Sequence, residues 1–414
     1  MAKKILVIGN TISAYSLAKA LSGKYEVFAA PGSDTVKEFA QCVDIRETSA
    51  PELLEFAVEN AIDLTIPVSE SSIKTEITDL FTKNRLQIFS PALNAAKPIF
   101  DKASAKRIFY KLKIPTPKFG IFEKQVMAKE YLKNQNTPFV IKTNEPSSAV
   151  IITSQNTSKK ILDSCFAKPQ KVIIEDYVYG SAFSFYAITD GYKALPLGTS
   201  LTYRHSLEGE GGQLTCGMGA CVPNYKLSVE NEGFIMNGVV YPLLDYLENS
   251  GNPYTGILGI NGILADDGRI QVLGFQPFMS DADCEGILQS LDTDLYTLFE
   301  SCIIGSFSDE VEFVPQKDIS SVSLTLVCKN REDKENVIYG LETLDDTVST
   351  AFSPKVRRNR YLELEAPQGE VMVITAQGRT LSSAVKKVYD EVSDIEFRGL
   401  SYRKDIAKPL TLSV

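Results

Sequence analysis

The sequence is poor in the side chains that most often carry acid–base and metal chemistry. Its 414 residues include one histidine, His205, and no tryptophan. A single imidazole leaves little room for histidine-based acid–base catalysis or for a histidine metal site. Any chemistry therefore falls mainly to carboxylates, lysines and backbone amides.

Cysteine pairs and long apolar runs are missing as well. Seven cysteines are scattered along the chain without a C-x-x-C pair, a pattern that indicates neither a zinc site nor a disulfide framework and favours reduced thiols. No stretch approaches the roughly 20 apolar residues that a membrane helix needs. We therefore expect a cytoplasmic protein with free cysteines.

The charge balance argues against a general nucleic-acid surface. The formal net charge is −9 and the isoelectric point is near 5.0, so an extended basic face is not expected. The one strongly basic run is KVRRNR at residues 355–360. We interpret this run as a solvated loop.

Short apolar runs alternate with amphipathic segments over the first hundred residues. Strands are predicted at residues 4–9, 25–29, 62–68 and 86–89, and helices at residues 13–21 and 52–60. Such alternation is typical of a doubly wound parallel sheet. Gly9 is not followed by the glycine fingerprint of a dinucleotide site, which excludes a nicotinamide dehydrogenase.

The middle of the chain changes to an antiparallel pattern. A helix at residues 101–112 ends before Pro115, and strands are predicted at residues 139–143, 149–153, 172–176, 184–190 and 192–197. The glycine-rich segment at residues 206–221 fits either a surface loop or a lid that approaches a ligand.

A strand pair and an acidic patch follow. Apolar runs at residues 257–264 and 270–275 are joined by Asp266-Asp267-Gly268, a turn signal that predicts a β-hairpin. The acidic patch of Asp281, Asp283 and Glu285 comes next, before a predicted helix at residues 287–299. Beyond residue 311, strands at residues 321–327 and 370–375 and a helix at residues 380–392 indicate a small α+β domain.

These motifs, in this order, resemble those of the ATP-grasp carboxylate–amine ligases, and most closely the phosphoribosylamine–glycine ligase family. The resemblance covers nearly the whole chain. It is carried by VIGN at residues 7–10, APG at 30–32, IDLTIPVSE at 62–70, IFSP at 88–91, KIPTP at 113–117, PFVIK at 138–142, IIEDYVYG at 173–180, CGMGA at 216–220, YTGIL at 254–258 and YRKDIA at 402–407.

The resemblance implies a multidomain α/β and α+β protein with an ATP-grasp fold. It would have an N-terminal doubly wound parallel-sheet domain at residues 1–100, an ATP-grasp domain at residues 101–310 and a C-terminal α+β domain at residues 311–414. The family activates glycine with ATP to an acyl phosphate, which the amine of phosphoribosylamine attacks in purine biosynthesis. ATP, glycine and phosphoribosylamine are thus the implied small-molecule partners, with no nucleic acid and no membrane.

The resemblance also assigns roles to individual residues. Lys102 and Lys142 match phosphate-contacting lysines, and the segment Glu175, Asp176, Tyr177 and Val178 matches the one that meets adenine. Substrate contacts are implied for Gly9, Asn10, Glu70, Gly217, Met218 and Gly219. A catalytic role is implied for Asp281, the acid of the family's Arg-Phe-Gly-Asp run. Arg204 is a further catalytic candidate, although the family's Asp-His-Lys-Arg run is here Thr202-Tyr203-Arg204-His205.

Several positions depart from the family pattern. TNEPSSA at residues 143–149 replaces a phosphate loop with a Gly-Lys-Gly core, although proline has no N–H and glutamate repels phosphate. The magnesium pair of the family's Glu-Phe-Asn run is here Gly274-Phe275-Gln276, which supplies no carboxylate. The family's arginine before the glycine-aspartate pair is Phe278. The resemblance implies ATP as the cofactor if the chain is active, and these departures make magnesium binding doubtful.

The residues leave three functions open. The first is an active ligase of this family in diverged form, with Arg204, Asp281, Asp283 and Glu285 taking over some roles. The second is a non-catalytic relative that serves as a nucleotide-binding or interaction module, motivated by the lost metal and phosphate groups. The third is a ligase with another amine or acid substrate.

Overall fold

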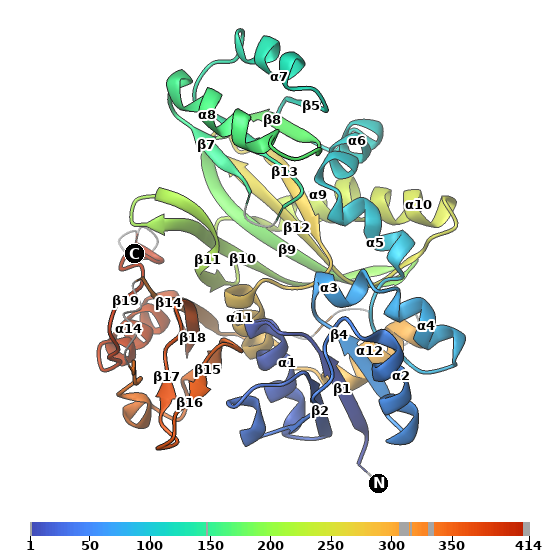
Figure 1. Ribbon diagram of the computed structural model, residues 1–414, viewed down its shortest axis with the longest axis vertical. Helices are drawn as coiled ribbons and strands as arrows, with labels where there is room; N and C mark the ends of the chain where they lie inside the picture. Colours follow the sequence, from blue (N-terminus) through green and yellow to red (C-terminus); the bar gives the residue numbers. More distant parts are fainter. Residues whose placement is uncertain (1, 146–147, 306–313, 315–316, 330–334, 409–414) are drawn as a thin grey trace.

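The computed structural model describes residues 2–145, 148–305, 314, 317–329 and 335–408. Figure 1 shows a small lobe at the top, a large sheet in the centre, and two further parts below it, the N-terminal one in blue and the C-terminal one in orange and red. The predicted start of a third region near residue 311 lies outside the described residues.

The N-terminal part is a parallel sheet covered on both faces, as predicted. Its strands have the order β3-β2-β1-β4. They are β1 (Lys4–Ile8), β2 (Glu26–Ala30), β3 (Gln41–Cys42) and β4 (Leu64–Pro67), with helices α1 (Ile12–Ser22), α2 (Ala50–Glu59), α3 (Glu70–Ile73) and α4 (Ile77–Lys83) and the short turn η1 (Val36–Glu38). Alternate residues of β1 pack toward α1 on one face and toward α2 and α4 on the other. This alternation explains the continuous apolar run of the strand.

The strand predicted at residues 86–89 is wrong. The structure has only a single parallel bridge there, between Thr65 and Ile88. The chain leaves α4 through Arg85, which has a left-handed backbone with φ of 61°. Few residues then remain before Pro91, which has no N–H for a longer ladder.

The central sheet is antiparallel and has nine strands. Eight of them follow the order β13-β12-β9-β10-β11-β14-β18-β15, and β19 pairs with β14. The strands are β9 (Gly180–Gly191), β10 (Ala194–Leu207), β11 (Gly211–Val222), β12 (Tyr254–Ala265), β13 (Ile270–Gln276), β14 (Ser320–Cys328), β15 (Ser349–Phe352), β18 (Gly369–Gly378) and β19 (Leu400–Ser401). The predicted hairpin at residues 257–275 is confirmed as β12 and β13.

Helices cover both faces of this sheet. On one face, α5 (Leu93–Phe100), α6 (Lys102–Leu112), α9 (Val229–Ile235), η2 (Met236–Val240) and α10 (Tyr241–Asn249) contribute to a core that includes Phe183, Phe185 and Leu258. On the other face lie α11 (Asp281–Ser290) and α12 (Leu295–Ile304), and Tyr186 and Ile188 of β9 belong to a core that these helices share with the N-terminal sheet. The central sheet is therefore buried along much of its length.

Two sequence predictions in this region are wrong. The helix expected at residues 287–299 is two helices, because Leu291 is extended and Asp294 caps the start of α12 by accepting from the amide of Thr297. The glycine-rich segment at residues 206–221 is neither a loop nor a lid. It forms the turn and second strand of the β10–β11 hairpin, and Gly219 pairs with Leu324 of β14. A Cβ atom at Gly219 would lie 2.6 Å from the carbonyl oxygen of Ser323, so glycine permits the close approach of the two strands.

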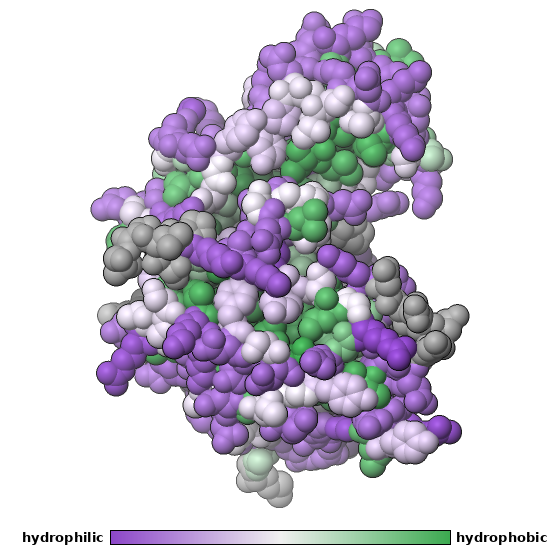
Figure 2. Space-filling view, turned by 90° about the vertical axis from the view of Figure 1, so that its left-hand side faces the viewer, coloured by the Kyte–Doolittle hydropathy of each residue, from purple (hydrophilic) through white to green (hydrophobic). Residues whose placement is uncertain are grey.

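The lobe at the top of Figure 1 is a four-stranded antiparallel sheet with the order β5-β8-β6-β7. It consists of β5 (Phe119–Phe122), β6 (Phe139–Lys142), β7 (Val150–Ile152) and β8 (Val172–Asp176), with α7 (Gln125–Leu132) and α8 (Gln155–Cys165). In the space-filling view of Figure 2, the outline of the molecule narrows on the right below this lobe. The lobe is thus a distinct unit above the central sheet.

The C-terminal strands join the central sheet directly. Helix α14 (Leu381–Val392) packs on β14 and β18, and the short elements η3 (Leu341–Thr343), β16 (Arg357–Arg358) and β17 (Leu364–Glu365) complete this part. The charged side chains of the basic run at residues 355–360 are exposed, as predicted. The prediction that the run is a loop is wrong for Arg357 and Arg358, because they form β16, which pairs with β17. The backbone amide of Arg358 donates to Asp34 of the N-terminal part, at 3.1 Å.

In the described part of the chain, none of the seven cysteines is paired in a disulfide. Among the described helices, none is both long and apolar enough to cross a membrane.

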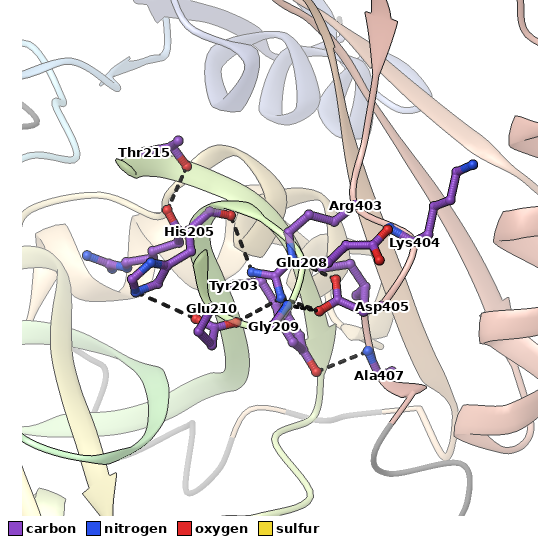
Figure 3. A network of polar contacts seen from close by, with 12 residues as sticks. Tyr203, His205, Glu208, Gly209, Glu210, Thr215, Arg403, Lys404, Asp405 and Ala407 are labelled. Carbon is purple, nitrogen blue, oxygen red and sulfur yellow. Dashed lines mark hydrogen bonds and ion pairs between the residues drawn. The ribbon is translucent and has the colours of Figure 1, made fainter. Parts of the chain in front are cut away.

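A buried arginine ties the C-terminal tail to the β10–β11 hairpin (Figure 3). Arg403 is 2% exposed and contacts both carboxylate oxygens of Asp405, at 2.8 and 2.7 Å. Its guanidinium also lies 2.8 Å from Glu210 and donates to the carbonyl oxygen of His205 at 3.3 Å. The amide of Ala407 donates to the hydroxyl of Tyr203. The hairpin is held at several points by residues almost 200 positions away.

Replacing Arg403 by methionine should lower the free energy of unfolding by about 2 to 4 kcal/mol, because Asp405 and Glu210 lose a shared buried partner. Urea denaturation measures the change. The matched control is Arg269→Met, since the Arg269–Asp267 pair is exposed and should contribute less than about 1 kcal/mol. Equal midpoints for both variants would contradict the role of Arg403.

Candidate active site

The small lobe meets the central sheet along its edge strand, β13. The amide of Val272 donates to the carbonyl oxygen of Pro115 at 2.8 Å, and the Thr116 hydroxyl donates to the Val272 carbonyl at 2.8 Å. One residue further along, the Lys142 Nζ atom lies 3.5 Å from the Leu273 carbonyl oxygen. Side chains of the lobe therefore reach the edge of the central sheet.

A buried ionic trio occupies this junction. The Glu175 carboxylate lies 2.7 Å from Nζ of Lys106 and 2.5 Å from Nζ of Lys142, and the three side chains are 3%, 1% and 9% exposed. β8, α6 and β6 supply one member each. Two ammonium groups and one carboxylate leave a net positive charge, which an anionic ligand would balance.

Burial and neighbouring charge shift the pKa values of this cluster. Burial lowers the pKa of Lys106 to about 8, and the charge of Lys142 acts in the same direction. Burial by itself would raise the pKa of Glu175, but the charges of Lys142 and Lys106 outweigh it and hold that pKa below its usual range. Glu175 thus stays ionised between the two lysines.

Lys102 adds a third lysine at the start of α6. Its Nζ donates to the carbonyl oxygens of Thr143 and Glu145, at 2.8 and 2.9 Å, and to the Ser148 hydroxyl at 3.3 Å. Burial lowers the pKa of Lys102 to about 8, with Lys142 as the next cause, while the charge of Glu70 opposes the shift. The structure therefore brings together three predicted site residues, Lys102, Lys142 and Glu70.

The segment predicted to meet adenine lies at the end of β8. The side chain of Glu175 is engaged in the ionic trio, and Asp176 accepts from the Gln135 amide at 2.5 Å. Tyr177 is partly buried and packs edge-on against Tyr179, with ring centroids 4.9 Å apart. Val178 is also partly buried.

The two predicted catalytic residues lie in different surroundings. Arg204 is half-buried on β10 and donates to Asn261 Oδ1 of β12 at 2.6 Å. Asp281 begins α11 and accepts from the amide of Ser13 at 2.8 Å. Burial raises the pKa of Asp281. Within the described residues, the hydrogen bonds of Asp281 join α11 to α1 and do not reach the lysines.

The predicted substrate-binding residues divide between two sheets. Gly9 and Asn10 follow β1, where the Asn10 amide donates to Glu47 at 2.8 Å, and Glu70 pairs with Lys74 at α3. The other three residues, Gly217, Met218 and Gly219, belong to β11, and Met218 is buried. The first group lies at the carboxyl edge of the parallel sheet, which is where open α/β sheets hold ligands.

Sequence reasoning missed three members of the site, Lys106, Asn261 and Tyr186. Lys106 lies one helical turn after Lys102, and this spacing was a signal that could have placed both on one face. Asn261 is a polar residue within the apolar run of β12. Tyr186 had no signal, because its hydroxyl meets Gln276 and Asp283 only in the folded chain, at 2.6 and 2.7 Å.

The positions that the resemblance assigns to magnesium do not fit a magnesium ion. Gly274 has no ligand atom, and the Gln276 amide oxygen already accepts from Asn261 at 3.1 Å. No group of three histidine, cysteine, aspartate or glutamate residues in the described ranges could hold a metal ion.

Comparisons with known proteins agree with this architecture. Family models of phosphoribosylglycinamide synthetase match residues 3–97 with the N domain and residues 100–284 with the ATP-grasp (A) domain. A phosphoribosylamine–glycine ligase of Halalkalibacterium halodurans is 30% identical over 97% of this chain and 96% of that protein. This chain belongs to the phosphoribosylamine–glycine ligase family. The relative from Caldanaerobacter subterraneus subsp. tengcongensis is 28% identical over 98% of this chain and 99% of its own length.

Solved structures agree on the fold. The phosphoribosylamine–glycine ligase of Thermotoga maritima superposes with a TM-score of 0.80 at 21% identity, over 97% of this chain and 99% of that chain. A biotin carboxylase domain from Hydrogenobacter thermophilus, solved with MgADP, ADP and bicarbonate, gives a TM-score of 0.72 at 13% identity, over 97% and 92% of the two chains. The predicted ATP-grasp fold and family are therefore confirmed. The domain boundaries and the roles of individual residues stay predictions.

The ionic trio predicts a specific pH dependence of stability. The pKa of Lys106 is lower in the folded chain than its ordinary value of 10.5, so the unfolded chain binds more protons between pH 8 and 10.5. The free-energy contribution of Lys106 should rise with pH in that window. The pKa of Glu175 is also lower in the folded chain than in the unfolded chain. The contribution of Glu175 to the free energy of unfolding is therefore complete above the pKa of the unfolded state, and it is lost as pH falls through the pKa of the folded state.

Glu175→Gln should lower the free energy of unfolding by about 3 to 5 kcal/mol at pH 7, because two buried ammonium groups lose their counter-charge. The destabilisation by Glu175→Gln should become smaller as pH rises from 8 to 10.5, because Lys106 loses its charge in that range. Urea denaturation across this range measures both effects. Glu130→Gln is the control, because Glu130 pairs with Lys133 at the surface. If the destabilisation by Glu175→Gln is independent of pH, the explanation by lost counter-charge is excluded.

Proposed function

We propose that the chain joins glycine to phosphoribosylamine with ATP as the energy source. The glycine carboxylate would attack the terminal phosphorus of ATP and release ADP. The amine would then attack the resulting acyl carbon and release phosphate. The observation that carries the proposal is the convergence of Lys102, Lys106 and Lys142 where the small lobe meets β13.

The lysines suit the phosphates of a nucleotide. Lys142 reaches the edge of β13, and the net positive charge of the trio favours an anion in a partly buried place. Lys102 holds the backbone that follows β6, so it can position that segment as well as attract charge. Their part in the reaction is to bind and orient the nucleotide and to offset charge as the terminal phosphate is transferred.

The parallel sheet supplies groups that suit the amine. Glu47 lies against the Asn10 amide, and Glu70 lies close enough to Lys102 to influence its pKa. Carboxylates at the carboxyl edge of β1 and β4 would attract a substrate ammonium group toward the nucleotide. The glycine or phosphoribosylamine nitrogen is the group we assign to this edge.

Family membership favours this ligase over the other two functions that the residues left open. The two relatives described above are named phosphoribosylamine–glycine ligases, and this chain aligns with nearly their full length. A non-catalytic relative rests mainly on Gly274 and Gln276, and the comparisons add nothing to it. Magnesium accompanies ADP in the biotin carboxylase domain described above. The comparisons therefore give no support to the expectation of doubtful magnesium binding.

The test of the proposed function is ADP release by the purified chain with ATP and magnesium. Release should require both glycine and phosphoribosylamine, and the product should contain the new amide. ADP release that is indifferent to either substrate would sink the proposal. If other acids or amines restore the release, the ligase with different substrates replaces it.

Lys102→Met should lower kcat/KM for ATP by about 100-fold, the size of a lost electrostatic contact in a partly buried site. Because the pKa of Lys102 is about 8, kcat/KM for ATP in the unmodified chain should fall as pH rises above 8. Lys102→Arg should move that fall to higher pH. The control is Lys159→Met, which removes an exposed lysine of α8. A profile that Lys102→Arg leaves unchanged would assign the titration to another group.

A further inference from the structure

A row of small and polar residues crosses the central sheet at the level of Gly274. Gly274 on β13 lies opposite Asn261 on β12, Asn261 lies opposite Ser184 on β9, and Ser184 lies opposite Ser200 on β10. Directly opposed residues on neighbouring strands face the same side of a sheet. Gly274, which supplies no metal ligand, is therefore the end residue of a row of small and polar side chains on one face of the sheet.

Nothing in the packing requires glycine at position 274. A Cβ atom built there meets no other atom within 4 Å, and its φ lies outside the left-handed region. Gly259, two pairs away, is different. Its Cβ atom would lie 2.5 Å from Gln276 and 2.9 Å from Tyr186, so glycine is needed for those two side chains to meet across β12. The fold accepts a larger side chain at position 274.

Arg204 points to the same row from β10. The pairing of β10 with β11 shifts register between Tyr203 and His205, so Arg204 sits at a bulge, a feature that redirects a side chain. One guanidinium nitrogen donates to Asn261 Oδ1 at 2.6 Å. The other donors of this half-buried group have no carboxylate partner within 4.0 Å among the described residues.

A second cation, Lys142, lies close to the backbone beside position 274. The Lys142 Nζ atom lies 3.5 Å from the carbonyl oxygen of Leu273, the neighbour of Gly274 in the chain. Asn261, the residue opposite Gly274, holds Arg204. Two cations of the protein thus flank the position at which the family pattern places a metal-binding carboxylate.

We infer that Arg204 binds the nucleotide phosphates at β13 and supplies there, with Lys142, the positive charge that a strand-held metal ion would supply. The inference rests on the proposed function for the identity of the nucleotide. A carboxylate at position 274 would neutralise Arg204, and glycine leaves its guanidinium free to face phosphate oxygens. Asn261, which accepts a hydrogen bond from Arg204, itself donates to Gln276, and Gln276 donates to the Tyr186 hydroxyl. These hydrogen bonds fix Asn261 in the position that orients Arg204.

The experiment is calorimetric titration of the full chain with a non-hydrolysable ATP analogue, in excess magnesium and in EDTA. The unmodified chain should bind in both, with dissociation constants within about threefold. Arg204→Gln should weaken binding in EDTA by about 10- to 100-fold, the range of a charge-assisted contact to phosphate. Arg204→Lys should restore part of this loss, because it keeps the charge without the planar fork.

Gly274→Glu is the converse variant. It should weaken binding in EDTA at least tenfold and recover affinity when magnesium is added, because the new carboxylate repels phosphate unless a cation intervenes. Matched controls are Arg107→Gln on the exposed face of α6 and Gly23→Glu, where a Cβ atom also meets nothing. Neither control should change affinity more than twofold.

An unmodified chain that loses more than tenfold in affinity in EDTA would overturn the inference, and so would unchanged binding by Arg204→Gln. Because calorimetry measures binding without turnover, a failure of the inference about Arg204 can be distinguished from a failure of the proposed ligase function. A chain that binds nucleotide as expected but forms no amide would leave Arg204 in place and refute the ligase. Unfolding midpoints of each variant identify any that bind poorly because they are misfolded, and the partial rescue by Arg204→Lys then decides the matter.

Discussion

The ionic trio of Lys106, Glu175 and Lys142 is the constraint on which the candidate site depends. It joins α6, β8 and β6 in a place almost closed to water, where each lysine would be unfavourable without the carboxylate. The trio fixes the small lobe at the edge of β13 and, at the same time, leaves an uncompensated positive charge there. One interaction therefore sets both the geometry and the electrostatics of the proposed phosphate site.

The C-terminal part contributes to that site although it lies outside it. Its strands extend the central sheet, and Arg403 holds the hairpin whose first strand carries Arg204. The bulge that directs Arg204 toward Asn261 is thus supported from the tail of the chain. We expect a substitution of Arg403 to disturb this hairpin, because Arg403 contacts His205 and Glu210 within it.

The electrostatic pattern differs between the two ends of the candidate site. Lysines gather at the lobe, whereas Glu47 and Glu70 lie at the carboxyl edge of the parallel sheet. This division is consistent with the proposed arrangement, in which phosphate oxygens lie at the lobe and a substrate nitrogen lies at the parallel sheet. The loss of the carboxylate at position 274 removes negative charge from the phosphate end and so sharpens the division.

The sequence by itself determined the parallel sheet, the β12–β13 hairpin and the family, because periodicity, turn chemistry and motifs can be read along the chain. The roles of Lys102 and Lys142 stay predictions from the family resemblance. It did not determine β11, since glycine-rich strands are specified by the neighbours that pair with them. Lys106, Asn261 and Tyr186 were likewise decided by the tertiary structure. Their hydrogen-bond partners lie 10 to 97 residues away, as in Lys106–Thr116 and Tyr186–Asp283, and only folding brings such groups within contact distance.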